Sequence, residues 1–481
     1  MKLSAGISAI CTYTCAAYRS HAGIFVPVWL LCFFGEETEN DQGRGRNMST
    51  ITYRLPEERA ELARRLAPQR KLYDRSVSKG VADLFDQVER EGDQAVVRLT
   101  ESFDGVPIAQ VKLTDDYIER CLSELPTPLK AAMEQARDHI REVNAALLPA
   151  SWQRVIRPGT IIGEKISPLD TVGIWIPARK GPLISTALML VAAAQTAGVR
   201  RIVVGMPPLA NGLGDPATVA AARMAGAGEI VVGNGVAVIA GFCHGTASIP
   251  RANGIFGPGP GGIAAAMSLA SSYGVKTVVG IGPTECVVFA DETADARIVA
   301  YDLLNEGEHG PDSSAVLVTT NGELAARVES HLAELIGQTE PPRKDYLHTV
   351  FGANGLGAIV VASSTEEGCR FINDYAPEHV MIVCKPETER KALELIENAG
   401  ELLIGPYTPF SAANYGIGIT AVLPTNGYAA AFSGITSKDM VKASTIGKLD
   451  REALGGLLPI VRELGGYERL PFHVQAAEAR L

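Results

Sequence analysis

Apolar residues recur at helical spacing over the first third of the chain. Between residue 56 and about residue 146 they fall at i, i+3 and i+4, and charged residues occupy the opposite faces. The pattern predicts amphipathic surface helices within residues 55–69, 81–105 and 128–147.

A different pattern begins near residue 171. Four short runs of apolar, largely β-branched residues end in glycine or a proline-containing loop, at residues 171–177, 201–208, 229–235 and 276–282. Such runs are typical of strands buried on both faces. Helix-like segments separate the first three runs, and one of them has Ser185 as a plausible N-cap and Gly198 as its stop. We therefore predict a parallel sheet with right-handed crossovers and ligands beyond the C-terminal strand ends.

A second set of alternating elements runs from about residue 285 to residue 425. Strand patterns occur at residues 286–291, 315–320, 358–363, 380–384 and 401–405. Helical patterns occur at residues 295–309, 322–335 and 365–376, and again near the end of the chain at 439–446 and 450–470. The chain is therefore predicted to be an α/β protein with two halves and a small helical C-terminal tail.

Composition narrows the possible partners. Of 481 residues, 46% are apolar, enough for two or more domains around a large core. The net charge of −10 argues against nucleic acid or an anionic membrane, because phosphate binding requires clustered Lys and Arg; a small polar substrate remains compatible. None of the eight cysteines forms a CxxC pair, so we expect a reducing, cytoplasmic setting and no cysteine-type zinc site.

The N-terminus carries the apolar run "GIFVPVWLLCFFG" (residues 23–35). It is about half as long as the ~20 residues that a membrane helix needs, so no membrane span is predicted. No small-x-small cleavage site follows it, although a signal peptide remains an alternative. We expect residues 1–47 to be an extension that is disordered or absent from the mature protein, with Met48 as the working start.

Two acid–imidazole pairs are candidates for chemistry. Asp302, Glu306 and His309 are spaced i, i+4 and i+7, so they share one helix face, and zinc accepts both carboxylate and imidazole ligands. Alternatively, His309 caps a helix beside a solvated acidic face. Glu378 and His379 precede a strand and suit paired proton transfer, unless they are an ordinary exposed loop pair.

Further signals are weaker singly. The polar, glycine-rich segment 405–440 is long enough to be functional, and Glu468 and His473 lie near the C-terminus. Glycine loops at 233–235 and 256–262 could approach a phosphate, but neither matches the G-x-G-x-x-G dinucleotide fingerprint.

Together the motifs "IFGPG", "EHGPDS", "APEH", "YTPFSAANY", "VLPTNGYA" and a final E-x-x-x-x-H resemble the histidinol dehydrogenase family, from about residue 55 to residue 481. The resemblance implies two incomplete Rossmann-like domains with small tail domains, in an intertwined homodimer with a shared active site. We assign residues 48–170 and 283–432 to the first domain, 171–282 to the second and 433–481 to the tail. It also implies one zinc and two NAD per oxidation of a primary alcohol, through the aldehyde, to a carboxylate.

Matched motif by motif, the resemblance implies roles for particular residues. Glu378 and His379 would be the general acid/base pair. Zinc ligands would be Glu306, His309, Asn414 and, from a second copy of the chain, His473. Substrate contacts would be Thr284, Glu468 and His379, and cofactor contacts would be Trp175, Ala237 and Pro260.

This sequence also departs from the family pattern. The family has glutamine at Glu306 and aspartate at Asn414, so one carboxylate is gained and one is lost. At the cofactor positions this chain has Trp175 where the family has tyrosine, and Ala237 and Pro260 where it has glutamine and asparagine. It also has Ala421 in place of a family histidine, and Arg179 and Lys180 in place of a glycine pair.

These departures leave three interpretations open. The first is NAD- and zinc-dependent oxidation of histidinol to histidine. The second is a paralogue that oxidises another polar or anionic alcohol, such as a sulfonated diol, which Arg179 and Lys180 would favour unless they belong to an ordinary exposed loop. The third is a catalytically impaired binding protein, against which the intact Glu378–His379 pair speaks.

Overall fold

The structure is a computed structural model of the chain and describes residues 18–19, 25–26, 50–66, 73–178, 181–259 and 261–481. Contacts divide the chain into residues 1–46 and residues 47–481. In the first unit the described residues form two short paired strands, β1 (Tyr18–Arg19) and β2 (Phe25–Val26). The expected extension, residues 1–47, otherwise lies outside the described residues. Over the part of the chain that is described, no helix has the length and apolar character to cross a membrane.

A six-stranded parallel sheet forms one half of the larger unit, in the order β15-β14-β11-β12-β13-β3. Its strands are β3 (Ile51–Leu55), β11 (Glu285–Ala290), β12 (Ser314–Thr319), β13 (Ala358–Ala362), β14 (His379–Val383) and β15 (Glu401–Ile404). Five of these strands were predicted from their apolar runs. β3 was missed because ITYRL, a short strand at the edge of the sheet, lacks the continuous apolar run of the other five.

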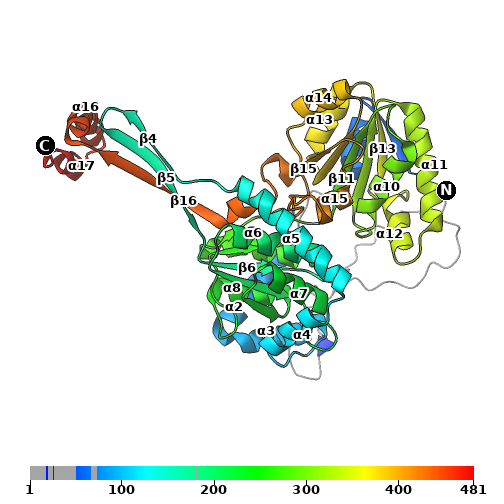
Figure 1. Cartoon of the computed structure of the whole chain (residues 1–481), viewed down its shortest axis with the longest axis horizontal. Helices are drawn as coiled ribbons and strands as arrows, with labels where there is room; N and C mark the ends of the chain where they lie inside the picture. The colour runs from blue at the N-terminus through cyan, green and yellow to red at the C-terminus, as the bar shows by residue number, and fades with distance from the viewer. Residues whose placement is uncertain (1–17, 20–24, 27–49, 67–72, 179–180, 260) are drawn as a thin grey trace, which may run out of the picture. The chain divides into compact units, whose positions relative to one another are not determined.

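Helices cover both faces of this sheet (Figure 1). One apolar core lies beneath α10 (Ala296–Gly307), α11 (Gly322–Gln338), α12 (Arg343–Val350) and α15 (Phe410–Tyr415). The opposite core lies beneath α1 (Arg59–Leu66), α13 (Thr365–Tyr375) and α14 (Pro386–Leu395). Burial on both faces explains why the strands read as continuous apolar runs.

A five-stranded parallel sheet forms the other half, in the order β10-β9-β6-β7-β8. Its strands are β6 (Thr171–Trp175), β7 (Arg201–Met206), β8 (Glu229–Val232), β9 (Gly254–Phe256) and β10 (Lys276–Thr277). Its helices are α6 (Ile184–Thr196), α7 (Pro216–Ala225), α8 (Gly235–His244) and α9 (Gly262–Ala270), followed by the 3-10 helix η3 (Ser271–Tyr273). The α/β fold class and the parallel sheets are confirmed.

Two local predictions in this half were wrong. Ser185 does not cap α6: the backbone turns at Leu183, no side chain caps the helix, and Ser185 already lies inside it. The predicted strand 276–282 is paired only over β10, because the chain leaves the sheet after Thr277 toward Gly280, whose φ is 95°. Gly198, with φ 82°, does follow the end of α6 as predicted.

The amphipathic helices of the first third pack into the core of the five-stranded sheet. They are α2 (Arg75–Glu91), α3 (Asp93–Asp104), α4 (Asp115–Ser123) and α5 (Thr127–Leu147). Our sequence-based domain boundaries grouped residues 48–170 with the other sheet. We now propose that only β3 and α1 of that stretch join the six-stranded sheet, because the buried faces of α2–α5 contact α6–α9 and their strands.

The C-terminal region contributes a strand to a three-stranded antiparallel sheet, β16-β5-β4. β16 (Val441–Leu449) pairs along its whole length with β5 (Thr160–Pro168), and β4 (Trp152–Arg157) pairs on the other side of β5. The helix predicted at 439–446 was therefore wrong, because its first two residues end the 3-10 helix η5 (Ser437–Met440) and the rest, from Val441, is a ladder partner of β5. The helices α16 (Arg451–Tyr467) and α17 (Pro471–Glu478) complete the tail.

Candidate active site

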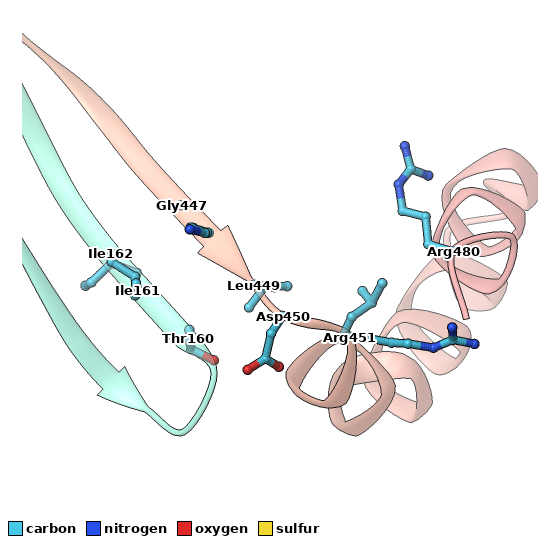
Figure 2. A pocket seen from close by; sticks show the side chains of 10 residues that line it. Thr160, Ile161, Ile162, Gly447, Leu449, Asp450, Arg451 and Arg480 are labelled. Atoms are coloured by element: carbon cyan, nitrogen blue, oxygen red, sulfur yellow. The ribbon is translucent and has the colours of Figure 1, made fainter.

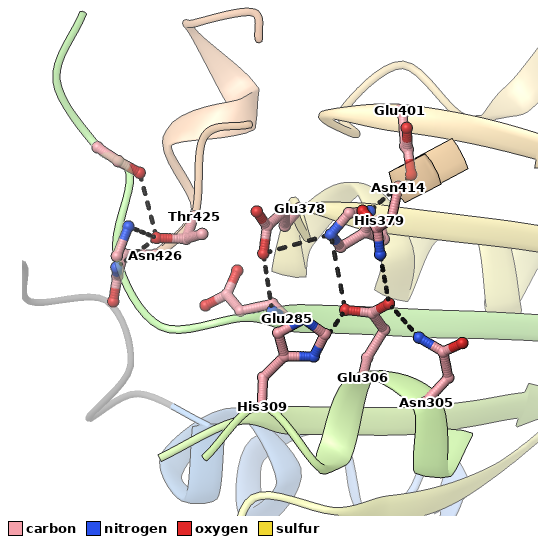
Figure 3. Close-up of polar contacts among 12 residues, drawn as sticks. Glu285, Asn305, Glu306, His309, Glu378, His379, Glu401, Asn414, Thr425 and Asn426 are labelled. Carbon is pink, nitrogen blue, oxygen red and sulfur yellow. Dashed lines mark hydrogen bonds and ion pairs between the residues drawn. The ribbon is translucent and has the colours of Figure 1, made fainter. Parts of the chain in front are cut away.

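The candidate site gathers at one edge of the six-stranded sheet. Glu285, His379 and Glu401 are the first residues of β11, β14 and β15. Because these strands are parallel and neighbouring, with His379 paired to Glu401, their first residues lie at the same edge. α10 ends there too, since it leads into β12, and it brings Glu306 to the cluster (Figure 3). The acidic groups thus meet at the N-terminal ends of these strands. For the five-stranded sheet we had expected ligands beyond the C-terminal strand ends, which is the opposite edge.

His379 is held from two sides. Its Nδ1 lies 2.6 Å from Glu401 Oε1, and its Nε2 lies 3.5 Å from Glu378 Oε2 and 3.9 Å from Glu306 Oε2. The Phe410 ring packs edge-on against the imidazole, with 5.6 Å between centroids. Burial favours the neutral imidazole, but the carboxylates of Glu378, Glu306 and Glu401 outweigh burial and raise the pKa of His379. The surrounding carboxylates therefore stabilise the protonated form of the ring.

Glu378 is the acidic neighbour of this imidazole. Its side chain is buried, and its Oε2 accepts a hydrogen bond of 3.2 Å from the backbone N–H of Glu285. Burial raises the pKa of Glu378, while the charge of His379 opposes the rise and that of Glu306 adds to it. A buried carboxyl with a raised pKa beside an imidazole is suited to proton transfer near neutral pH.

Glu306 lies fully buried in the last turn of α10. Its Oε1 accepts hydrogen bonds from the side-chain amides of Asn305, at 2.8 Å, and Asn414, at 3.4 Å. Its Oε2 has no hydrogen-bond partner among the described residues and faces His309 Nδ1 at 3.6 Å and His379 Nε2 at 3.9 Å. A buried charged oxygen without a hydrogen bond is costly, which marks this atom as a candidate ligand.

His309 and Asn414 approach Glu306 from different segments. α10 ends at Gly307, so His309 lies just beyond the helix and not on its last turn, because the backbone leaves the helix after the C-cap Glu308. The His309 side chain is 43% exposed. Asn414 lies on α15, within the polar segment 405–440, so this part of the predicted loop does reach the site.

The donor set fits zinc in kind. Glu306 and His309 offer a carboxylate oxygen and an imidazole nitrogen, both of which zinc accepts. Asn414 donates its side-chain N–H2 to Glu306 in this structure, so its amide oxygen would have to turn to the metal. The Glu306 oxygen without a hydrogen bond also suits a cation. In the described part of this single chain, no group of three or more His, Cys, Asp or Glu is arranged to hold a metal ion. A complete shell would need a further ligand.

The other predicted residues fall elsewhere. Glu468 caps the end of α16 and His473 lies on α17; both are exposed, and no hydrogen bond or ion pair among the described residues joins their side chains to Glu306. Thr284 directly precedes β11, and its carbonyl accepts the N–H of Ser314 at 2.9 Å.

The predicted cofactor contacts belong to the five-stranded sheet. Trp175 ends β6 and Ala237 lies in α8, and both are buried. A Cβ at Gly235, the first residue of α8, would lie 2.6 Å from the Trp175 ring, so glycine permits this close approach. Pro260, Arg179 and Lys180 lie outside the described residues, so the expectations for them stay predictions.

Glu401 and Glu285 were not identified from the sequence as site residues. Each is a buried acid at the first position of an otherwise apolar strand. That placement is itself a signal, because an acid is rarely buried without a partner. Which acid meets His379, however, depends on the pairing of β14 with β15, and a local motif does not contain that information.

A separate pocket lies against the antiparallel sheet and α16 (Figure 2). Its lining includes Thr160, Gly447, Asp450, Arg451 and Arg480. The Asp450 side chain caps α16 by accepting the N–H of Ala453 at 2.9 Å. None of the predicted site residues lines this pocket.

Comparison with known proteins gives a consistent result. The family profile described as histidinol dehydrogenase matches residues 67–481. A histidinol dehydrogenase of Synechocystis sp. is 37% identical over 83% of this chain and 91% of its own length. A histidinol dehydrogenase homolog of Colwellia psychrerythraea is 34% identical over 82% and 89%. The crystal structure of histidinol dehydrogenase from Elizabethkingia anophelis superposes with a TM-score of 0.84 at 28% identity, covering 91% of this chain and 99% of that one.

The motifs, the fold and the acidic site at the strand edge therefore converge with the sequence matches. The chain belongs to the histidinol dehydrogenase family, a family of oxidoreductases.

Proposed function

We propose that this protein is a zinc- and NAD-dependent dehydrogenase that oxidises a primary alcohol through the aldehyde to the carboxylate, with L-histidinol as the first substrate to test. The observation that carries the proposal is the buried Glu378–His379 pair beside Glu306, with His379 Nε2 3.5 Å from Glu378 and 3.9 Å from Glu306. Burying this many carboxylates around one imidazole is unfavourable for folding. Such an arrangement is typical of a catalytic site.

His379 is the proposed base. In the first oxidation its Nε2 takes the proton of the substrate hydroxyl while a hydride leaves the same carbon for NAD. In the second, Glu378 takes a proton from a water molecule that adds to the aldehyde, and the resulting hydrate gives up the next hydride. The short distance between the two groups lets the pair act on one substrate carbon.

Zinc would be held by Glu306, His309 and Asn414, with His473 from a second copy of the chain as the further ligand. Zinc, when bound, would polarise the alcohol oxygen and fix its orientation. The Glu306 Oε2, which has no hydrogen-bond partner among the described residues, supports this assignment. The carbon chemistry of the oxidation belongs to NAD, for which Trp175, Ala237 and Pro260 are the proposed contacts.

Exposed apolar side chains around His473 support a homodimer with a shared site. Tyr467 is 91% exposed, Phe472 78% and Leu464 61%, all on the two tail helices or at their ends. Large apolar side chains grouped on a surface mark a protein–protein contact. A second copy covering this surface would bury them and also carry the ligand His473, with the substrate contact Glu468, to a partner's Glu306.

The test is NAD reduction by the purified full chain supplied with zinc, over a panel of L-histidinol, other amino alcohols and anionic diols including a sulfonated one. Reduction with one of these alcohols, and loss of the rate after a chelator removes zinc, is the expected result. Growth rescue of a histidine auxotroph separates histidinol from the other substrates. Binding of NAD or of an alcohol without reduction of NAD across the panel would contradict the proposal and favour a binding protein.

A further inference from the structure

Glu401 is a buried carboxylate that the proposed reaction does not use. It is the first residue of β15, its side chain is 6% exposed, and it is paired in register with His379, the first residue of β14. Its backbone N–H donates to the carbonyl of Glu378 at 3.0 Å, which fixes the strand beside the catalytic pair. Glu401 is therefore positioned by the sheet itself and not by a loop.

The contact between Glu401 and the imidazole is directional. Oε1 lies 2.6 Å from Nδ1 of His379, a short distance typical of a charge-assisted hydrogen bond. With Nδ1 bonded there, Nε2 is the nitrogen left to face Glu378 and Glu306, at 3.5 and 3.9 Å. Which nitrogen of a histidine carries the proton is set by the hydrogen bond that the other nitrogen makes.

Stability alone is a poor explanation for this carboxylate. Oε2 of Glu401 has no hydrogen-bond partner among the described residues, so half of the buried group is unsatisfied. Apolar residues would fill such a position at no electrostatic cost, because desolvation offsets much of the attraction in a buried ion pair. The neighbouring residue Leu403, also buried, is apolar as expected for this strand.

We propose that Glu401 is a positioning residue for His379: it accepts the Nδ1 hydrogen, fixes the ring, and directs the Nε2 lone pair toward the substrate hydroxyl. The inference rests on the proposed function, in which His379 is the base. As the O–H bond of the alcohol breaks, its proton passes to Nε2, the hydride passes to NAD, and the C–O bond becomes C=O. Glu401 keeps its contact with Nδ1 and stabilises the imidazolium that this step creates.

The test compares Glu401→Ala and Glu401→Gln with a matched control, Leu403→Ala, which shortens a buried side chain two residues along the same strand. Loss of the acceptor should lower kcat about 10- to 100-fold with KM changed less than about twofold, since Glu401 does not touch substrate. The glutamine variant keeps an acceptor oxygen and should lie between the wild type and Glu401→Ala. Equal rates in all four proteins, or an equal loss in Leu403→Ala, would overturn the inference.

A spectroscopic measurement tests the same contact without turnover. In protein labelled with 15N-histidine, the Nδ1 proton of His379 should give a strongly downfield signal that is absent from His379→Gln and from Glu401→Ala, and weaker in Glu401→Gln. Persistence of the signal in Glu401→Ala would sink the inference. If no alcohol is oxidised, the proposed function fails while this signal still decides whether Glu401 holds the ring.

Discussion

The two parallel sheets are built alike but differ in where they tolerate charge. In the five-stranded half, the buried stretch of α6 from Ala187 to Ala194 is entirely apolar, and Phe242 fills the space above Gly173. In the six-stranded half, buried strands begin with Glu285, His379 and Glu401. Among the described residues, buried charged side chains lie in the six-stranded half and most of them gather at this edge, although Asp291 and Glu367 lie elsewhere in that half. Because buried charge disfavours folding, this gathering separates the part of the molecule shaped by chemistry from the part shaped by packing.

The largest expected effect tests the charged edge. His379→Ala removes the proposed base and should lower kcat about 100- to 10,000-fold, while the free energy of unfolding changes far less than the activation free energy. Steady-state kinetics and denaturant unfolding measure both. His331→Ala, at a partly exposed histidine on α11, is the matched control and should keep full activity. Unchanged turnover in His379→Ala would remove its assigned role.

The next largest expected effect is on zinc binding, compared between Glu306→Ala and Glu308→Ala. Glu306→Ala deletes the buried Oε2 and should weaken zinc binding by about 100-fold, because losing a ligand costs more than losing an outer partner. Glu308→Ala, an exposed acid two residues away, should bind zinc as the wild type does. Metal content after dialysis against zinc buffers decides the question, and equal zinc in both variants would exclude Glu306 as a ligand.

The pH dependence of stability tests the effect of burial on Asp302, a carboxyl group in the six-stranded half. Burial raises its pKa to about 7, above the value of 3.8 expected for an unburied aspartate. The unfolded chain therefore ionises first, and Asp302 lowers stability progressively as pH rises from about 4 to 7. The advantage of Asp302→Asn over the wild type should therefore grow by about 3 kcal/mol of unfolding free energy between pH 5 and pH 8. A pH-independent difference between the two proteins would show that burial does not perturb this carboxyl.

The smallest expected effect lies in the apolar sheet. A Cβ at Gly173 would sit 2.7 Å from the Phe242 ring, so Gly173→Ala should cost about 1 to 3 kcal/mol of stability. Gly322→Ala, where nothing lies within 4 Å of the added carbon, is the control. Turnover per folded molecule should be unchanged in both. A large fall in kcat for Gly173→Ala with normal stability would break the division between the two halves.

The sequence predicted the elements whose signal is local. Continuous apolar runs predicted β11 to β15, and the i, i+3, i+4 pattern predicted α2 and α5. It failed where the signal comes from a distant partner: β16 (VKASTIGKL) has no regular alternation of apolar and polar residues and is stabilised by pairing with β5, far away in the chain. β9 is three residues long, too short for its pattern to distinguish it from a loop.

The residues of the candidate site also divide into those with a local sequence signal and those without one. Glu378–His379 and Glu306 with His309 were visible as short motifs, and the structure brings them together. Asn414 was assigned through family resemblance, because an asparagine in a polar loop carries no ligand signal of its own. Glu401 was missed because its partner, His379, lies on another strand, and strand pairing fixes their contact.

The pairing of β16 with β5 constrains how the chain is made. Every residue from 169 to 440 must leave the ribosome before Val441 can meet Pro168. Contacts between such distant segments form late, since closing a long loop costs entropy before the ladder compensates for it. Until then β5 has one unpaired edge, which is a template for joining another chain. Synthesis of the last forty residues therefore decides whether that edge is closed by its own chain or by a neighbour's.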